Sequence, residues 1–225
     1  MAKALLCDID GTLVQSNWLH AEAWQIAFEA MGLDLELEAI RRQIGKGGDE
    51  LIPVFVPWWK RPIVEEPLKT YRKFVFQHGL RQQVKAIPGV RELLERVRAE
   101  GIKVAVATSS DKDDLKVMLG VAGADDLIDE QTTADDADRA KPHPDIFAAA
   151  VEKLHLPATD CIALGDTPYD AESAGKAGIR TIGVMTGGWS RIELLDAGCI
   201  EVYESAGELL AGIEQSALLR TGLRV

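Results

Sequence analysis

Short runs of almost wholly apolar residues alternate with longer helical patterns along most of this chain. The strongest runs cover residues 4–7, 103–108, 161–164 and 181–184, and weaker ones lie near 127–128 and 201–203. Helical patterns fill the intervals at 90–100, 112–119, 144–154, 169–177 and 191–197. Strands that are apolar on both faces are typical of a parallel sheet covered by helices on both sides. The alternation therefore predicts the α/β class, with a Rossmann-like, doubly wound parallel sheet.

One stretch, residues 16–86, departs from this alternation and is helical in pattern. Helices are expected at 18–31, 35–44 and 66–77. An insertion directly after the first strand lies over the carboxyl edge of the sheet, where open α/β sheets bind their ligands. We therefore expect a core of residues 1–15 and 87–225 and an inserted α-helical cap of residues 16–86.

The segment PVFVPWWKRP, residues 53–62, holds three prolines inside this insertion. Proline removes a backbone donor and disfavours a helix interior, so an irregular connection between two cap helices is expected here. Exposed aromatic residues favour interfaces. For Trp58 and Trp59, however, packing beneath the cap is the preferred interpretation.

Two acidic motifs follow predicted strands. In DIDGTL, residues 8–13, Asp8 and Asp10 project to the same side because side chains alternate along a strand. Carboxylates this close repel each other, and a cation or a shared proton relieves the repulsion. In GDTPYD, residues 165–170, Asp166 and Asp170 lie one turn apart where a helix begins, so they are either capping residues or metal ligands. Together the two motifs predict a hard divalent ion, and Mg²⁺ is the usual choice in phosphate chemistry.

Hydroxyl and lysine side chains are expected at the same edge of the sheet. Thr108, Ser109 and Ser110 follow the strand at 103–107, where hydroxyls and free backbone N–H groups suit phosphate oxygens or cap a helix. Lys141, followed by two prolines in KPHP, is either a surface residue or a compact positive charge for phosphate and nucleophile.

These residues resemble the haloacid dehalogenase superfamily of phosphotransferases. Its four ordered motifs correspond to DIDGTL, the turn at Thr108, Lys141 in KPHP, and GDTPYD. A helical cap after the first motif is similar to the phosphoglycolate phosphatase and β-phosphoglucomutase branch. The resemblance covers essentially the whole chain and implies the same fold, with Mg²⁺ as cofactor.

The resemblance also implies roles for the motif residues. Asp8 would attack phosphorus and form an aspartyl-phosphate, while Asp10 would protonate the leaving oxygen and then deprotonate water. For the first role Asp10 needs a raised pKa, which the neighbouring carboxylates would supply. The ion would be held by Asp8, Asp166 and the backbone carbonyl of Asp10, with Asp170 ordering metal-bound water. The implied catalytic set is Asp8, Asp10, Thr108 and Lys141, and the implied metal set is Asp8, Asp10, Asp166 and Asp170.

Several activities occur in this superfamily, and the sequence separates them. Dehalogenases lack the second aspartate, so Asp10 argues against dehalogenation. A sugar phosphomutase is the main alternative, because β-phosphoglucomutases carry a His and a Trp similar to His20 and Trp24. Those mutases have a cap-loop arginine and a Glu-Asp pair where this chain has GKGGDE, residues 45–50, and Gly165-Asp166. Both departures favour a phosphatase. A non-catalytic binding protein is least favoured, because every motif residue is retained.

The GKGGDE loop is expected to contact substrate, although an ordinary turn between cap helices is the alternative. Consecutive glycines permit close backbone approach and disfavour a helix. For His20 the alternative is packing within the first cap helix. The expected substrate-binding residues are Ser109, Ser110, Gly45, Lys46, Gly47 and His20.

Charge and cysteine content limit the partners of the chain. With 225 residues and a formal net charge of -11, it lacks the basic field that nucleic-acid or anionic-membrane binding needs. Three cysteines without CxxC spacing predict free thiols, buried at Cys7 and Cys161. Without a signal-peptide profile or a membrane-length segment, a cytoplasmic location is expected. The expected partner is a small phosphorylated metabolite, and the expected state is a monomer or homodimer. The C-terminal LRTGLRV is expected to fray.

Overall fold

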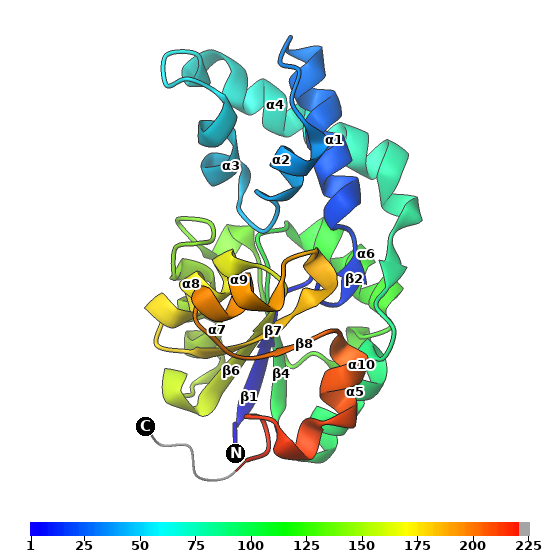
Figure 1. Ribbon diagram of the computed structural model, residues 1–225, viewed down its shortest axis with the longest axis vertical. Helices are drawn as coiled ribbons and strands as arrows, with labels where there is room; N and C mark the ends of the chain where they lie inside the picture. Colours follow the sequence, from blue (N-terminus) through cyan, green and yellow to red (C-terminus); the bar gives the residue numbers. More distant parts are fainter. Residues whose placement is uncertain (221–225) are drawn as a thin grey trace.

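The computed structural model of the protein describes residues 1–220. Its centre is a six-stranded sheet in the order β5-β4-β1-β6-β7-β8, in which every neighbouring pair is parallel (Figure 1). The strands are β1 (Ala4–Cys7), β4 (Lys103–Ala107), β5 (Glu130–Thr132), β6 (Cys161–Gly165), β7 (Arg180–Val184) and β8 (Cys199–Tyr203). The predicted α/β class with a parallel sheet is confirmed.

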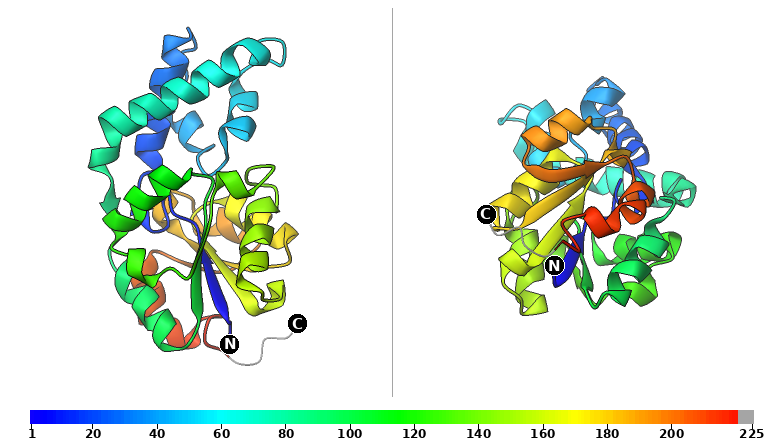
Figure 2. Two further views of the ribbon diagram at one scale, coloured as in Figure 1. Left: turned by 180° about the vertical axis from the view of Figure 1, so that it is seen from behind. Right: turned by 60° about the horizontal axis from the view of Figure 1, so that its bottom comes forward.

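Helices cover both faces of this sheet (Figure 2). They are α5 (Val90–Ala99), α6 (Lys112–Ala122), α7 (Asp145–Leu154), α8 (Pro168–Lys176), α9 (Arg191–Asp196) and α10 (Ala206–Ala211). Leu5 and Cys7 of β1 pack in an apolar cluster with α5, α6 and α10. The alternate residues Ala4 and Leu6 pack with α7 and α8. The unbroken apolar character of β1 therefore follows from burial on both faces.

A helical cap lies over the carboxyl edge of the sheet (Figure 1). It contains α1 (Asn17–Ala30), α2 (Leu37–Arg41), α3 (Gly48–Phe55) and α4 (Arg61–Val75), and α4 continues through a π-helical turn (Phe76–Leu80). The two crossings between cap and core pair as an antiparallel ribbon of β2 (Val14–Gln15) and β3 (Lys85–Ala86). Residues of α1 to α4 form an apolar cluster of their own, centred on Phe28, Leu51 and Leu68.

The proline-rich segment is more helical than predicted. Pro53 lies inside α3, and α4 begins at Arg61, five residues before the predicted start at 66. Pro62 occupies the first turn of α4, where its missing N–H has no intrahelical partner to lose. The irregular connection is therefore confined to the residues between the two helices.

Trp58 and Trp59 lie in this connection, and the prediction that they pack beneath the cap is wrong. Their exposed fractions are 73% and 60%, and their rings contact each other edge to face at 6.0 Å. The interior of the cap is already filled by the cluster around Phe28, so the short turn carries both rings outside it.

The weak strand predicted near 127–128 is also misplaced. Leu127 lies in a 3-10 turn, and β5 follows at Glu130–Thr132, with the sequence EQT. As an edge strand, β5 pairs on one side with β4 and needs no apolar run. The apolar residues before it instead pack against the core.

Three further predictions concern the cysteines, membrane spans and the C-terminal segment. Cys7, Cys161 and Cys199 are free and buried, as predicted for the first two. Between residues 1 and 220, no helix combines the length and the apolar character that crossing a bilayer needs. Residues 221–225, most of the segment expected to fray, lie outside the described residues.

Candidate active site

The candidate site lies where β1, β4 and β6 end side by side, because β1 pairs with both other strands. Asp8 and Asp10 follow β1, and Thr108 follows β4. Asp166 follows β6, and Asp170 lies in the first turn of α8. Parallel strands end at one edge of a sheet, so motifs far apart in the sequence meet there.

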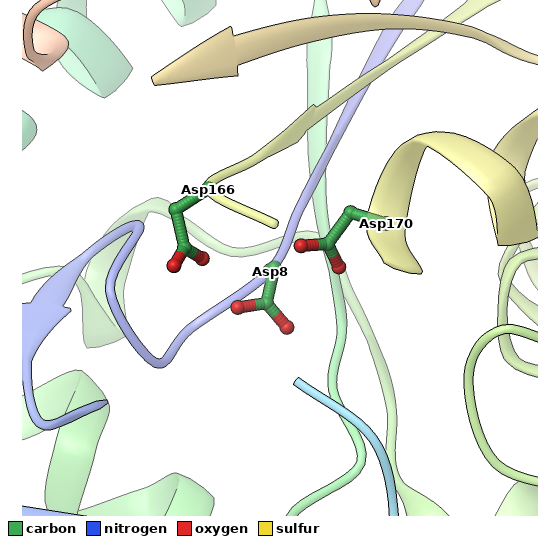
Figure 3. A group of neighbouring side chains, drawn as sticks. All are labelled: Asp8, Asp166 and Asp170. Atoms are coloured by element: carbon green, nitrogen blue, oxygen red, sulfur yellow. The ribbon is translucent and has the colours of Figure 1, made fainter. Parts of the chain in front are cut away.

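Asp8, Asp166 and Asp170 form a buried acidic cluster. One oxygen from each carboxylate lies within 4.8 Å of the others. Figure 3 shows the three side chains converging from the ends of β1 and β6 and from α8. The Asp10 carboxylate lies outside this cluster, and the expectation that its backbone carbonyl binds an ion stays a prediction.

Lys141 supplies the positive charge beside the acidic cluster. Its Nζ lies 2.5 Å from Asp8 Oδ1 and 2.8 Å from Asp170 Oδ1. It also donates to the backbone oxygen of Ala107 at 2.9 Å, and its side chain is wholly buried. Burial disfavours the ammonium, but the charges of Asp170 and Asp8 outweigh it and raise the pKa of Lys141. Lys141 is therefore an internal cation and not a surface residue.

The cluster has more negative charge than Lys141 balances. Burial raises the pKa of Asp8 to about 7; Lys141 opposes this shift, and the charges of Asp170 and Asp10 add to it. Burial, with Asp170 and Asp8, also holds the pKa of Asp166 well above its ordinary value. With all three carboxylates ionised, the form that binds a cation, the cluster and one ammonium have a net charge of -2 (-3 + 1). Carboxylate oxygens in this number and charge fit Mg²⁺.

Contacts from distant parts of the chain orient Asp166. Thr12 Oγ1 donates to Asp166 Oδ1 at 2.9 Å, and Asn17 Nδ2 donates to Asp166 Oδ2 at 2.8 Å. Gly187 and Gly11 lie so close that a Cβ at either position would fall 1.8 or 2.2 Å from Asp166 Oδ2. Sequence reasoning missed the role of Thr12, Asn17 and Gly187 in orienting Asp166.

Asp170 is a capping residue, one of the two interpretations that the sequence left open, and its role as a metal ligand stays a prediction. Thr167 donates to Asp170 Oδ2 from its hydroxyl at 2.7 Å and from its backbone N–H at 3.1 Å, which completes a capping box at the start of α8. Its other oxygen, Oδ1, faces Lys141. Asp170 therefore caps the helix and belongs to the acidic cluster.

Asp10 receives three hydrogen bonds at the boundary between core and cap. Ser16 Oγ lies 2.5 Å and His20 Nε2 lies 2.9 Å from Asp10 Oδ1, while Ser110 donates to Oδ2 at 3.0 Å. Burial alone would raise the pKa of Asp10, but the charge of His20 and these hydrogen bonds lower it below its ordinary value. The expectation of a raised pKa is therefore wrong, because donors and not carboxylates surround Asp10.

A cavity of about 60 Å³ separates these core residues from the cap. Its core side is formed by Asp8, Asp10 and residues 108–110, and its cap side by residues 44–48 with His20, Trp24 and Arg72. All six predicted substrate-binding residues, Gly45, Lys46, Gly47, His20, Ser109 and Ser110, line it. Lys46, however, donates to Gln43 at 2.7 Å and lies over the Tyr169 ring.

Arg72 is the cavity residue that sequence reasoning overlooked. It lies on α4, in a basic stretch, KTYRK, that carries no motif. Its guanidinium stacks over the Trp24 ring at 5.1 Å. The only signal in the sequence was the helical period of α4, which does not tell which basic residue turns toward the core.

Family comparison agrees with this arrangement. The family described as haloacid dehalogenase-like hydrolase matches residues 5–184. The chain belongs to that family. The match runs from β1 through the cap to the end of β7, so it includes all four haloacid dehalogenase motifs. The resemblance inferred from those motifs is confirmed.

Similar family members extend over core and cap together. A phosphorylated carbohydrates phosphatase from Thermotoga maritima is 28% identical over 90% of this chain and 94% of its own. A hydrolase from Pseudomonas syringae superposes with a TM-score of 0.87 at 30% identity, over 96% of this chain and 99% of its own. A CbbY variant from Rhodobacter sphaeroides, in complex with xylulose-(1,5)bisphosphate, superposes with a TM-score of 0.74 at 26% identity, over 93% of this chain and 96% of its own.

Proposed function

We propose that this haloacid dehalogenase-like protein is a Mg²⁺-dependent phosphatase that hydrolyses a small phosphorylated metabolite through an aspartyl-phosphate. The observation that carries the proposal is the position of Asp8. It lines the cavity, belongs to the acidic cluster and pairs with the buried Lys141. The Thermotoga maritima relative, named as a phosphatase of phosphorylated carbohydrates, supports the same class of reaction.

Asp8 is the proposed nucleophile. Lys141 at 2.5 Å favours its ionised form, which attack on phosphorus requires. A bond forms from an Asp8 oxygen to phosphorus as the bond to the leaving oxygen breaks. Residues 108–110 line the cavity and would hold the phosphoryl oxygens. When bound at Asp8, Asp166 and Asp170, Mg²⁺ supplies positive charge that stabilises the transferring phosphoryl group.

Asp10 and His20 are the proposed proton-transfer pair. The lowered pKa of Asp10 leaves it ionised, ready to take a proton from water in the second step. His20, whose Nε2 lies 2.9 Å from Asp10 Oδ1, is the proposed partner of Asp10 in delivering a proton to the leaving oxygen in the first step. From the sequence, Asp10 alone was instead expected to be the acid, with a raised pKa.

The proposal includes the division into a core of residues 1–15 and 87–225 and a cap of residues 16–86. The separate apolar cluster of α1 to α4 and the paired crossings β2 and β3 support it.

A cytoplasmic location agrees with three buried free thiols. The monomer or homodimer stays a prediction.

Hydrolysis of an aryl phosphate, with Mg²⁺ and with excess chelator, tests the function. We expect turnover with the ion and at least about a hundredfold less without it, because the acidic cluster then repels the phosphate. Asp8→Asn should leave no turnover above background in a protein that remains folded. Activity that survives this substitution would exclude Asp8 as the nucleophile. Labelled phosphate released to solvent, and not moved to a second sugar hydroxyl, distinguishes the phosphatase from a mutase.

A further inference from the structure

Arg72 presents a cationic group to the cavity without a partner of its own. Its Nε is buried and has no hydrogen-bond partner, and no ion pair joins its guanidinium to any residue between 1 and 220. A guanidinium carries five N–H donors, and a buried donor left unsatisfied is costly. A ligand that accepts a hydrogen bond from Nε would remove this cost.

The surroundings of Arg72 fix its position but do not neutralise it. Trp24, itself 3% exposed, stacks against the guanidinium at 5.1 Å and holds its plane. Burial lowers the pKa of Arg72, while Asp114, Asp10 and Asp111 raise it. An arginine remains charged under such a shift, since its ordinary pKa is above about 12.

Each of these nearby acids is bound to another residue. Asp111 pairs with Lys73 at 2.6 Å, and Asp114 pairs with Arg81 at 3.1 Å. Asp10 accepts its hydrogen bonds from Ser16, His20 and Ser110, as described above. The negative charge that would satisfy Arg72 therefore has to come from outside the described chain.

The other basic side chains near Arg72 are already engaged. Lys46, the second cation that lines the cavity, is held by Gln43 and Tyr169. Lys69, one turn before Arg72 on α4, pairs with Glu65 at 2.7 Å. Among the cavity-lining residues that the structure describes, Arg72 is the cation available for a ligand.

We infer that Arg72 determines substrate specificity by binding a second anionic group of the substrate while the reacting phosphoryl group lies at Asp8. This inference rests on the proposed phosphatase function. A guanidinium binds a carboxylate or a phosphate through two parallel hydrogen bonds, so both groups are suitable. The cavity is small, about 60 Å³, which favours a short substrate.

The test compares two substrates of equal length that differ in the second charge, and adds a longer bisphosphate. 2-Phosphoglycolate carries a carboxylate, and 2-hydroxyethyl phosphate carries a hydroxyl in its place. 1,3-Propanediol bisphosphate tests a phosphate as the second anion. We expect the wild-type enzyme, with Mg²⁺, to show a higher kcat/KM for an anionic substrate than for the hydroxyl analogue. Preference for 2-phosphoglycolate indicates a carboxylate, and preference for the bisphosphate indicates a phosphate.

Substitution of Arg72 should reduce this preference. For Arg72→Met we expect the ratio of the two kcat/KM values to fall roughly tenfold to a hundredfold, as for loss of a charge-assisted hydrogen bond. Arg72→Lys keeps the charge but loses the paired donors, so an intermediate ratio is expected. Lys73→Met is the matched control, because Lys73 neighbours Arg72 on α4 and pairs outside the cavity with Asp111. It should keep the wild-type ratio.

The outcomes separate this inference from the proposed function. If the wild-type enzyme hydrolyses phosphate monoesters without preferring an anionic one, the role of Arg72 is wrong and the phosphatase proposal stands. Equal losses on all substrates in Arg72→Met, at an unchanged melting temperature, also overturn the inference. If Arg72→Met does not fold, the ratio in Arg72→Lys decides. Absence of Mg²⁺-dependent hydrolysis in the wild-type enzyme instead contradicts the phosphatase proposal.

Discussion

At the scale of single residues, the orientation of the Asp166 carboxylate depends on residues that are not themselves proposed as catalytic or metal-binding. Thr12 and Asn17 each donate to one of its oxygens, and Gly187 leaves the space that its carboxylate occupies. A carboxylate held in this way presents its free lone pairs in a fixed direction. Such outer contacts commonly affect metal affinity as strongly as a weak ligand does.

Gly187→Ala tests this dependence. A Cβ at residue 187 would lie 1.8 Å from Asp166 Oδ2, so the carboxylate must move. We expect the Mg²⁺ concentration for half-maximal activity to rise roughly tenfold to a hundredfold. Gly175→Ala is the matched control, because a Cβ there meets nothing within 4 Å, and helical alanine should stabilise α8 by about 0.5–1 kcal/mol. An unchanged Mg²⁺ requirement in Gly187→Ala would show that Asp166 is not a ligand.

The motif residues could be placed from the sequence, but their supporting contacts could not. Asp8, Asp166 and Asp170 follow strands or begin a helix, so sheet geometry alone predicts that they meet. The bonds of Thr12 and Asn17 to Asp166 span 154 and 149 residues, and no local pattern marks them. The pKa of Asp10 was mispredicted for another reason: its donors Ser16 and His20 are near in sequence, but no pattern showed that their side chains turn toward it.

At the scale of elements, the accuracy of prediction follows burial. Strands β1, β4, β6 and β7 are buried on both faces, and their apolar runs identified them directly. The edge strand β5 is polar and was displaced by a few residues. In the cap, prolines indicated a break where α4 already begins, because Pro62 is tolerated in its first turn, and Pro53 lies inside α3.

The turn between α3 and α4 provides a stability test of the cap. Trp58 and Trp59 are largely exposed, so changing both to serine should alter the free energy of unfolding by less than about 0.5 kcal/mol. Trp24 is 3% exposed, and Trp24→Ala should cost about 3–5 kcal/mol. Denaturant unfolding measures both. A large loss in the double variant would mean that the turn packs against something in solution.

At the scale of the whole molecule, the acidic cluster links stability to pH and metal. Asp8 and Asp166 have pKa values above the unfolded value of about 3.9, so the metal-free folded state binds more protons than the unfolded state. Its stability therefore falls as pH rises through the raised pKa of Asp8, about 7. Asp10, with a lowered pKa, is ionised in both states over that range and adds no slope.

We expect the melting temperature of the chelated enzyme to fall between about pH 5 and about pH 8. Mg²⁺ binds ionised carboxylates, so its stabilising effect should be larger at the higher pH. Differential scanning calorimetry with and without the ion measures both trends. Asp8→Asn removes one titrating group and should flatten the metal-free dependence. A metal-free enzyme that gains stability as pH rises over this range would contradict the charge balance described for the cluster.

Ion pairs between cap and core have a consequence for the timing of the reaction. Arg42 of the cap lies 2.6 Å from Glu193 of the core, and Lys73 lies 2.6 Å from Asp111. Salt weakens such partly exposed pairs, since the Debye length shortens from about 30 Å at 0.01 M to about 3 Å at 1 M. If product leaves when the cap opens, kcat should rise with ionic strength. The rise should be smaller in Arg42→Gln, which lacks one of the two ion pairs. A kcat that does not change with salt would contradict a role for these ion pairs in cap opening. Ionic strength would then set how long the enzyme stays closed over its product.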